Sequence, residues 1–290
     1  MKTITILSGK GGVGKSTIVA SLGIVLSSRY KMVLADCDVD APNLALVFGF
    51  SENDFFAWED ISTNQIAVFD YEKCDSCKKC FSMCYFKAIR WEENKPQLKQ
   101  FGCEGCGVCE IVCPEGAVRL EDVVNAKIGF VRTQYGFNIV SSQLNSGESG
   151  SGKLVGKVKE KAKLVSPSAE IMLVDAAAGI GCPVIASVSG SDYCILAVEP
   201  TPSSLFDMER AWGMIKHFNI NGGIIINKFD INPQQCREIE KFARQNKIQI
   251  IGRLPYDKRF IKALVDMEPV IEKNNDIKQM FIQIADRIKF

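Results

Sequence analysis

The sequence lacks the features by which membrane-spanning and nucleic-acid-binding proteins are usually recognised. No uninterrupted apolar run approaches the roughly 18 residues that a membrane span needs. Basic and acidic residues are almost balanced, 35 against 34, so the net charge of +1 gives no reason to expect nucleic acid or an anionic membrane as a partner. The apolar stretch Ile4–Leu7 is short and runs straight into a glycine loop, unlike a signal peptide. We therefore expect a cytoplasmic protein without membrane contact.

Histidine is almost absent, whereas cysteine is abundant. The single histidine, His217, falls in an expected helix after Met208 with no partner motif, so we expect a structural role. Eight of the twelve cysteines lie between Cys74 and Cys113. Disulfides are rare in reducing cytosol, so this spacing favours metal ligation. The four scattered cysteines are expected to be small buried hydrophobic residues: Cys37, Cys182, Cys194 and Cys236.

Residues 8–17 read SGKGGVGKST and satisfy two phosphate-binding patterns at once. Gly9, Gly11 and Gly14 match the dinucleotide fingerprint G-x-G-x-x-G, and the same stretch also matches the P-loop G-x-x-x-x-G-K-S. A β-branched run over Thr3–Leu7 predicts a strand before the loop, and a helix is expected over Ser16–Ser28 after it. Both motifs require this strand-to-helix turn.

The lysine and hydroxyl at the end of the loop decide between the two patterns. A pyrophosphate bridge needs a close backbone and a helix N-terminus but no lysine. A triphosphate carries more charge and a Mg²⁺ ion, which Lys15 and the Ser16 hydroxyl suit. Asp36 and Asp38 after the next expected strand (31–35) fit either pattern. We predict an ATP site whose loop residues contact the nucleotide: Gly9, Gly11, Gly12, Val13, Gly14, Lys15, Ser16 and Thr17.

A second lysine in the loop, Lys10, identifies a branch of P-loop proteins. K-G-G-x-G-K-S resembles the deviant Walker A motif of the MinD/ParA/Mrp/nitrogenase-iron-protein ATPases. The resemblance implies an ATP-dependent homodimer in which Lys10 reaches the partner's phosphates and stabilises the charge that develops during transfer. Asp36-Cys37-Asp38 is similar to the family's switch I, with Asp38 implied to orient the attacking water. Both Lys10 and Asp38 are therefore expected to be catalytic.

The resemblance continues in the second half of the chain. Asp175 and Gly179 are similar to switch II, which implies that Asp175 holds Mg²⁺ through water and that Gly179 approaches the γ-phosphate. Asn227, after an apolar strand over 223–226, is implied to bind adenine, and Pro255 lies in a loop similar to the one that covers the base. A further G-x-x-x-x-G-K match over Gly147–Lys153 lacks the metal-binding hydroxyl. We expect it to be a flexible loop before a basic helix, although a role near the nucleotide or the dimer interface stays open.

Two cysteine runs share one spacing and form an internal repeat. CDSCKKCFSMC (74–84) and CEGCGVCEIVC (103–113) both read C-x₂-C-x₂-C-x₃-C, offset by 29 residues, which is typical of bacterial two-[4Fe–4S] ferredoxins. In that arrangement each fourth cysteine ligates the other cluster. The expected ligands are Cys74, Cys77, Cys80 and Cys113 for one cluster, and Cys103, Cys106, Cys109 and Cys84 for the other. Tyr85 departs from the usual proline, present as Pro114 in the second run. Two zinc sites are the alternative, but they leave the fourth cysteines unexplained.

The cysteine repeat is expected to interrupt a nucleotide-binding domain. Walker A and switch I precede it, and switch II and the base-binding elements follow. We predict a doubly wound, mostly parallel α/β sheet of the SIMIBI type over 1–61 and 123–290, with an inserted α+β ferredoxin domain over 62–122. An insertion whose ends meet on the host surface is a tolerated arrangement.

The combination predicts an ATPase that couples nucleotide-driven dimerisation to electron transfer with an unidentified redox partner. One alternative is an Mrp-like iron–sulfur cluster carrier, although no C-x-x-C pair lies outside the repeat. A third is a MinD-like spatial organiser at a membrane, suggested by an apolar stripe at helical spacing over 276–290. We expect that stripe to pack on the sheet instead.

Overall fold

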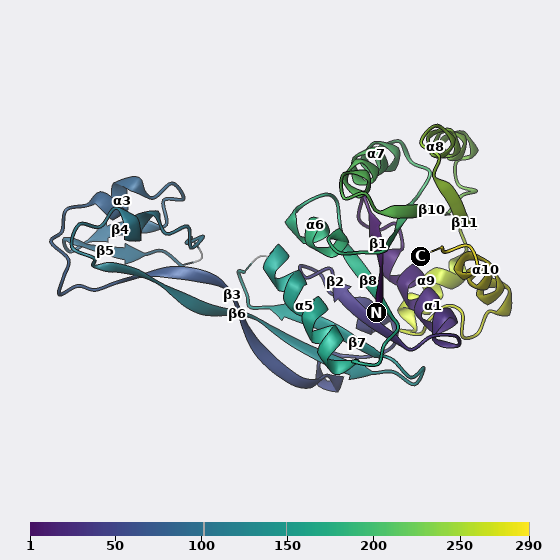
Figure 1. The fold of residues 1–290 in the computed structure, drawn as a ribbon, viewed down its shortest axis with the longest axis horizontal. Coiled ribbons are helices and arrows are strands. Elements are labelled where there is room, and N and C mark those ends of the chain that lie inside the picture. Colours follow the sequence, from purple (N-terminus) through teal and green to yellow (C-terminus); the bar gives the residue numbers. More distant parts are fainter. Residues whose placement is uncertain (101, 149, 290) are drawn as a thin grey trace. The chain divides into compact units, whose positions relative to one another are not determined.

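The computed structural model describes residues 1–100, 102–148 and 150–289. The chain forms two compact units (Figure 1). The first comprises Met1–Trp58, Ile128–Gln143 and the chain from Gly150 onward, and the second comprises Glu59–Lys127 and Leu144–Ser149.

The first unit is built on a parallel sheet of seven strands in the order β11-β10-β9-β1-β8-β2-β7. The central strand β1 pairs with β8 on one side and β9 on the other, so the chain order reverses there, as in a doubly wound fold. Beyond β7 the sheet continues with β6 and β3. The strands are β1 Lys2–Ser8, β2 Met32–Cys37, β3 Phe56–Phe69, β6 Val118–Arg132, β7 Asn138–Leu144, β8 Ile171–Ala178, β9 Tyr193–Val198, β10 Asn221–Asn227 and β11 Gln249–Leu254.

Helices cover both faces of this sheet (Figure 1). One apolar core joins the sheet to α1, α2 and α10, and another joins it to α6, α7 and α8. The central strands β1, β2, β8 and β9 are buried along almost their whole length, as both-face burial of a parallel sheet requires. The predicted doubly wound α/β architecture is confirmed. The helices are α1 Lys15–Ser27, α2 Leu44–Val47, the 3₁₀ helix η1 Glu52–Asp54, α5 Gly152–Val165, α6 Cys182–Val188, α7 Pro202–His217, α8 Pro233–Gln245, α9 Lys258–Val265 and α10 Asn275–Ala285.

The apolar stripe near the C-terminus packs inside the first unit. Ile277, Phe281 and Ile284 of α10 are almost fully buried in the core that contains α1. The prediction that the stripe packs on the sheet is therefore confirmed. The alternative interpretation, that this stripe forms an amphipathic helix at a membrane surface, is wrong. Within the part of the chain that the structure describes, no helix is both long and apolar enough to cross a membrane.

The second unit repeats one pattern twice. Helix α3 Lys79–Met83 precedes β4 Ile89–Glu92, which forms an antiparallel hairpin with β5 Lys95–Leu98. After the same offset of 29 residues, α4 Val108–Ile111 precedes the start of β6. Its small core contains Ala67, Ile89 and Val118 together with Cys80 and Cys109.

The second unit is longer than the insertion expected over 62–122. Its main segment runs from Glu59 to Lys127 because β3 and β6 are long continuous strands that serve both units. The returning segment joins it through two hydrogen bonds, from the Asn145 backbone N–H to the Asn125 carbonyl (3.0 Å) and from Asn145 Nδ2 to the Val124 carbonyl (2.9 Å). A pattern read from cysteine spacing carries no information about such strand extensions.

Of the scattered cysteines, three follow the prediction and one does not. Cys37, Cys194 and Cys236 are buried, whereas Cys182 is exposed. The prediction of burial for Cys182 is wrong because this residue is the first of α6, ahead of the helix's buried face. His217 ends α7, is exposed, and packs its ring against Phe218 at a centroid distance of 5.5 Å.

Candidate nucleotide-binding site

The glycine-rich loop connects the carboxyl end of β1 to the first residue of α1. Gly14 caps this helix with φ +89°, a left-handed conformation that favours glycine, and a Cβ there would lie 2.6 Å from Asn227 Nδ2. A Cβ on Gly9 would lie 2.4 Å from the backbone of Asp207 in α7. Backbone N–H groups at a helix N-terminus attract anions, so this loop is suited to phosphate.

A buried carboxylate faces the end of the loop. Asp175 on β8 is fully buried, and within residues 1–100, 102–148 and 150–289 neither of its side-chain oxygens has a hydrogen-bond partner of good geometry. Burial raises the pKa of Asp175 to about 6, while the neighbouring Lys15 ammonium and Ser16 hydroxyl oppose that rise. A carboxylate without a partner in the interior is costly, and a hydrated Mg²⁺ would satisfy it. The structure brings together the three side chains predicted to hold the phosphates and Mg²⁺, which are Lys15, Ser16 and Asp175.

Two further carboxylates lie beside Asp175. Asp36 is its direct neighbour across the β2–β8 pair. Burial, and then the charge of Asp175, raise the pKa of Asp36 well above its usual range. Asp36 accepts hydrogen bonds from the backbone N–H groups of Leu44 (3.0 Å) and Asp38 (3.3 Å). Sequence reasoning gave Asp36 no role of its own, yet its carboxylate holds the turn that carries Asp38.

Asp38 lines the same hollow as the phosphate loop. Partial burial raises its pKa; the nearby Lys15 lowers it and Asp40 raises it further. A carboxylate with a raised pKa beside a phosphate site can accept a hydrogen bond from water or take its proton. The structure thus places Asp38 on a cavity of about 430 Å³ that it shares with Gly14, Lys15, Ser16 and Thr17.

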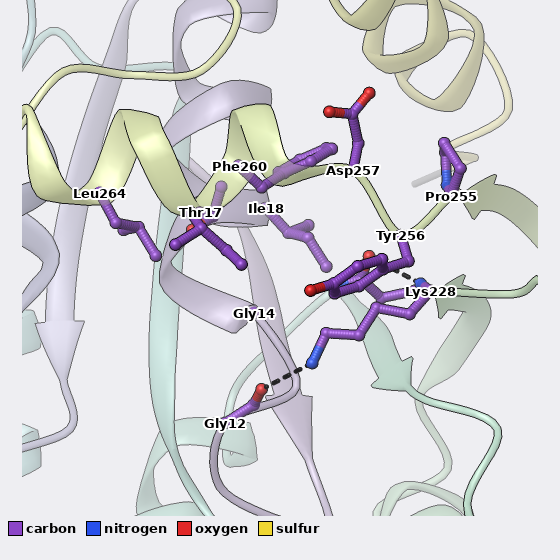
Figure 2. A pocket seen from close by; sticks show the side chains of 12 residues that line it. Gly12, Gly14, Thr17, Ile18, Lys228, Pro255, Tyr256, Asp257, Phe260 and Leu264 are labelled. Carbon is purple, nitrogen blue, oxygen red and sulfur yellow. Dashed lines mark hydrogen bonds between the residues drawn. The ribbon is translucent and has the colours of Figure 1, made fainter. Parts of the chain in front are cut away.

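A second, more apolar cavity of about 160 Å³ adjoins the loop (Figure 2). Tyr256, Phe260 and Ile18 supply flat apolar surface, and Pro255 lies at its edge. The Asn227 amide also lines it and donates from Nδ2 to the Val13 carbonyl at 2.8 Å. This lining suits a planar base, with one amide placed to recognise its edge.

Lys10 and another lysine share one carboxylate. Lys10 Nζ lies 3.3 Å from Glu199 Oε1, and Lys228 Nζ lies 3.0 Å from Glu199 Oε2. Lys228 also approaches the Gly12 carbonyl at 3.5 Å, drawn as a dashed line in Figure 2. Sequence reasoning missed Lys228, although its position directly after Asn227 places it at the carboxyl end of β10.

The G-x-x-x-x-G-K match over 147–153 does not form a phosphate loop. Lys153 lies in the first turn of α5, which Ser151 caps by accepting a hydrogen bond from the Leu154 N–H (3.2 Å). Gly150 donates its N–H to Asp40 Oδ1 at 2.7 Å. The segment is therefore a helix-capping loop that contacts the turn after Asp38. Ser149, within the match, lies outside the described residues.

The eight clustered cysteines of the second unit sort into two neighbourhoods. Cys80 has Cys74, Cys77 and Cys113 as neighbours, and Cys109 has Cys103 and Cys106. A small apolar cavity is lined by cysteines of the second set and by the fourth cysteine of the first run, which are Cys103, Cys106, Cys109 and Cys84. All cysteines are free thiols. Across residues 1–100, 102–148 and 150–289, no three His, Cys, Asp or Glu side chains form a group that could hold a metal ion.

The fourth cysteines occupy equivalent positions in the repeat. Cys84 Sγ accepts the Ala88 N–H at 3.3 Å, and Cys113 Sγ accepts the Ala117 N–H at 3.2 Å. Each bond spans four residues at the same repeat offset. Backbone N–H groups directed at sulfur stabilise thiolates and tune the clusters that they ligate.

Comparisons with known proteins identify the family of the nucleotide-binding fold. Residues 4–270 match the family model described as the CobQ/CobB/MinD/ParA nucleotide binding domain. An uncharacterized protein of Methanocaldococcus jannaschii is 31% identical over 287 residues, covering 99% of this chain and 96% of that protein. The septum site-determining protein MinD of Synechocystis is 23% identical and covers 99% of this chain and 89% of its own length.

Solved structures show the same fold. The MinD cell division protein of Aquifex aeolicus superposes with a TM-score of 0.59 at 22% identity, covering 99% of this chain and 96% of its own. The Pyrococcus horikoshii septum site-determining protein MinD, solved with Mg-ADP, has a TM-score of 0.59 at 17% identity and covers 98% of this chain and 94% of its own. At these identities the likeness establishes the fold alone.

Proposed function

Because the chain belongs to the CobQ/CobB/MinD/ParA nucleotide-binding family, we propose that it is an ATPase that gates electron transfer. In this proposal the second unit is a ferredoxin-like insertion that holds two [4Fe–4S] clusters. ATP binding draws two protomers together and thereby controls exchange of electrons with a redox partner. The sorting of eight cysteines into two repeat-related sets, in the same chain as an ATP-type site, carries the proposal.

The ATP half of the proposal assigns one task to each polar group. Lys15 contacts the β- and γ-phosphates, and Ser16 and Asp175 hold Mg²⁺, which would satisfy the carboxylate that lacks a partner. Asp38 orients the attacking water, and Lys10 of one protomer stabilises charge on the partner's phosphates. Asn227 and Pro255 receive the base.

The iron–sulfur half rests on how well the cysteines suit a cubane cluster. Cys74, Cys77, Cys80 and Cys113 would hold one cluster; Cys103, Cys106, Cys109 and Cys84 would hold the other. Four thiolates around a cube contact four different iron atoms, one thiolate to each iron. Bound clusters would supply one-electron transfer.

The chain path offers a route for coupling. The segment after Asp38 leads through α2 and η1 directly into β3, whose far end belongs to the second unit. Gly150, just after the segment that returns from the second unit, is hydrogen-bonded to Asp40. A nucleotide that reorders the turn around Asp38 therefore acts on two of the four places where the chain passes between the units, those before Glu59 and before Gly150.

A second candidate function is delivery of iron–sulfur clusters, as in Mrp-like carriers. The observation that favours it is the exposed Cys182, which lies seven residues after Asp175 at the start of α6. Carriers need labile clusters, whereas four cysteines per cluster would retain them.

The two candidates are separated by anaerobic reconstitution with iron and sulfide. Gated electron transfer predicts two magnetically interacting [4Fe–4S] signals by electron paramagnetic resonance after reduction, with clusters that resist chelators. The carrier function predicts rapid loss to a chelator or an apo-ferredoxin, and dependence of that loss on Cys182. Protein that binds no iron after reconstitution would contradict both.

A further inference from the structure

Glu199 lies at the junction of the phosphate and base subsites. It follows the last residue of β9 and is only 8% exposed, so its carboxylate is largely withdrawn from water. Its two oxygens face different cations, Lys10 from the phosphate loop and Lys228 from the end of β10. The Glu199 backbone N–H is in turn bonded to Ser204 Oγ at 3.3 Å, which fixes the start of α7 beside it.

The two lysines differ in how tightly they are held. Lys228 is closer to Glu199, at 3.0 Å against 3.3 Å, and its side chain is less exposed, 30% against 40%. Lys228 also reaches the Gly12 carbonyl, whereas Lys10 has only Glu199 as a partner among the described ion pairs and hydrogen bonds of its side chain. Lys10 is therefore the more easily released cation.

We propose that Glu199 is a positioning residue that holds Lys10 within its own protomer until ATP-driven dimerisation transfers it to the partner's phosphates. Lys228 makes the transfer possible, because a buried carboxylate that loses its only cationic partner would raise the free energy of the protein. With Lys228 in place, Glu199 stays neutralised when Lys10 leaves. This inference rests on the proposed dimerisation, although its first test does not require it.

Removal of the Glu199 carboxylate and removal of the Lys228 ammonium should have opposite effects on dimerisation. Glu199→Gln removes the competing anion, so Lys10 is free to engage a second protomer. Dimerisation at saturating Mg-ATP should then tighten by about twofold to fivefold, the range expected for a partly exposed ion pair. Lys228→Met leaves Lys10 as the sole partner of Glu199, so dimerisation should weaken. Glu209→Gln, an exposed glutamate of α7, is the matched control and should change nothing.

The ion pair between Lys10 and Glu199 is tested first in nucleotide-free protein, by acetylation of lysine amines followed by mass spectrometry. In the wild type, Lys10 should react more slowly than the exposed Lys153, and Glu199→Gln should accelerate Lys10 severalfold without altering Lys153. Equal Lys10 reactivity in wild type and Glu199→Gln would overturn the inference. Because no nucleotide is present, this result is independent of whether the protein dimerises.

Dimerisation is then measured by light scattering with a non-hydrolysable ATP analogue in a double-mutant cycle. The gain from Glu199→Gln should vanish in Lys10→Ala protein. A gain that persists without Lys10, or a loss of dimer in Glu199→Gln, would overturn the inference. Wild-type protein that stays monomeric, but whose Lys10 reactivity responds to Glu199, would instead refute the proposed dimerisation.

Discussion

Asp175→Asn should make the nucleotide-free protein more stable while removing its response to Mg²⁺. The ionised carboxylate is buried, finds no hydrogen-bond partner of good geometry among the described residues, and has a pKa raised to about 6 from 3.8. A shift of that size corresponds to about 3 kcal/mol of destabilisation at neutral pH. This net shift already includes the opposing effect of Lys15, so an increase of up to about 3 kcal/mol is expected.

The pH dependence follows from the direction of the shift. A folded-state pKa above the unfolded value means that the protonated group stabilises the fold below pH 3.8, and that this contribution is lost as pH rises through 6. The stability advantage of Asp175→Asn over the wild type should therefore be small at pH 4 and grow until about pH 7. Burial raises the pKa values of Asp36 and Asp38 in both proteins, but Asp175→Asn also removes the charge that raises the pKa of Asp36 in the wild type. Ionisation of Asp36 is therefore less costly in the variant, which adds to its stability advantage as the pH rises.

The assay is urea and thermal unfolding of both proteins between pH 4 and pH 8, with and without Mg-ADP. The wild type should be strongly stabilised by Mg²⁺ together with nucleotide, whereas Asp175→Asn should respond to nucleotide alone. A variant that is less stable than the wild type without ligand, or that keeps the full Mg²⁺ response, would refute the assignment of Asp175.

Three other predictions address the loop, the fold and the second unit. Gly9→Ala forces a Cβ to within 2.4 Å of backbone in α7 and should weaken ATP binding at least about tenfold by calorimetry, whereas Gly11→Ala, with open space around it, should bind nearly as the wild type does. Lys159→Met removes the ammonium that donates to three carbonyls at the end of α6, of which the Ser187 carbonyl keeps the Thr5 hydroxyl as a donor, and should lower the free energy of unfolding by about 2 kcal/mol. The exposed Lys157→Met should cause almost no change, and equal losses would refute the difference. Cys84→Ser should halve the amount of iron bound per protein after reconstitution if the fourth cysteine of each run ligates the cluster of the other run. An unchanged amount of bound iron would contradict that ligation.

Local sequence patterns predicted the elements that position the site but missed the interactions across them. The run over Thr3–Leu7 and the glycines after it fixed a strand, a turn and a helix, because each depends on neighbouring residues. The pairing of Lys10 and Lys228 on Glu199 joins residues far apart in the chain. Its formation depends on the order of β1, β9 and β10 in the sheet, which local patterns do not encode.

Spacing was equally informative, and equally limited, in the cysteine repeat. The offset of 29 residues reappears in α3 and α4 and in the sulfur hydrogen bonds of Cys84 and Cys113. The main segment of the unit, Glu59–Lys127, extends past both predicted ends, 62 and 122. The reason is that β3 begins well before the first cysteine run and β6 continues well past the second. Exposure of Cys182 also escaped prediction, since its burial depends on which side of α6 meets the sheet.

Potentiometric titration of the reconstituted protein, followed by electron paramagnetic resonance with and without Mg-ATP, tests the central claim most directly. Lys10→Ala protein is titrated alongside. ATP-gated electron transfer predicts two [4Fe–4S] signals whose midpoint potentials shift with Mg-ATP in the wild type and do not shift in Lys10→Ala. Two clusters whose potentials are the same with and without nucleotide in the wild type would contradict control of their potentials through the dimer.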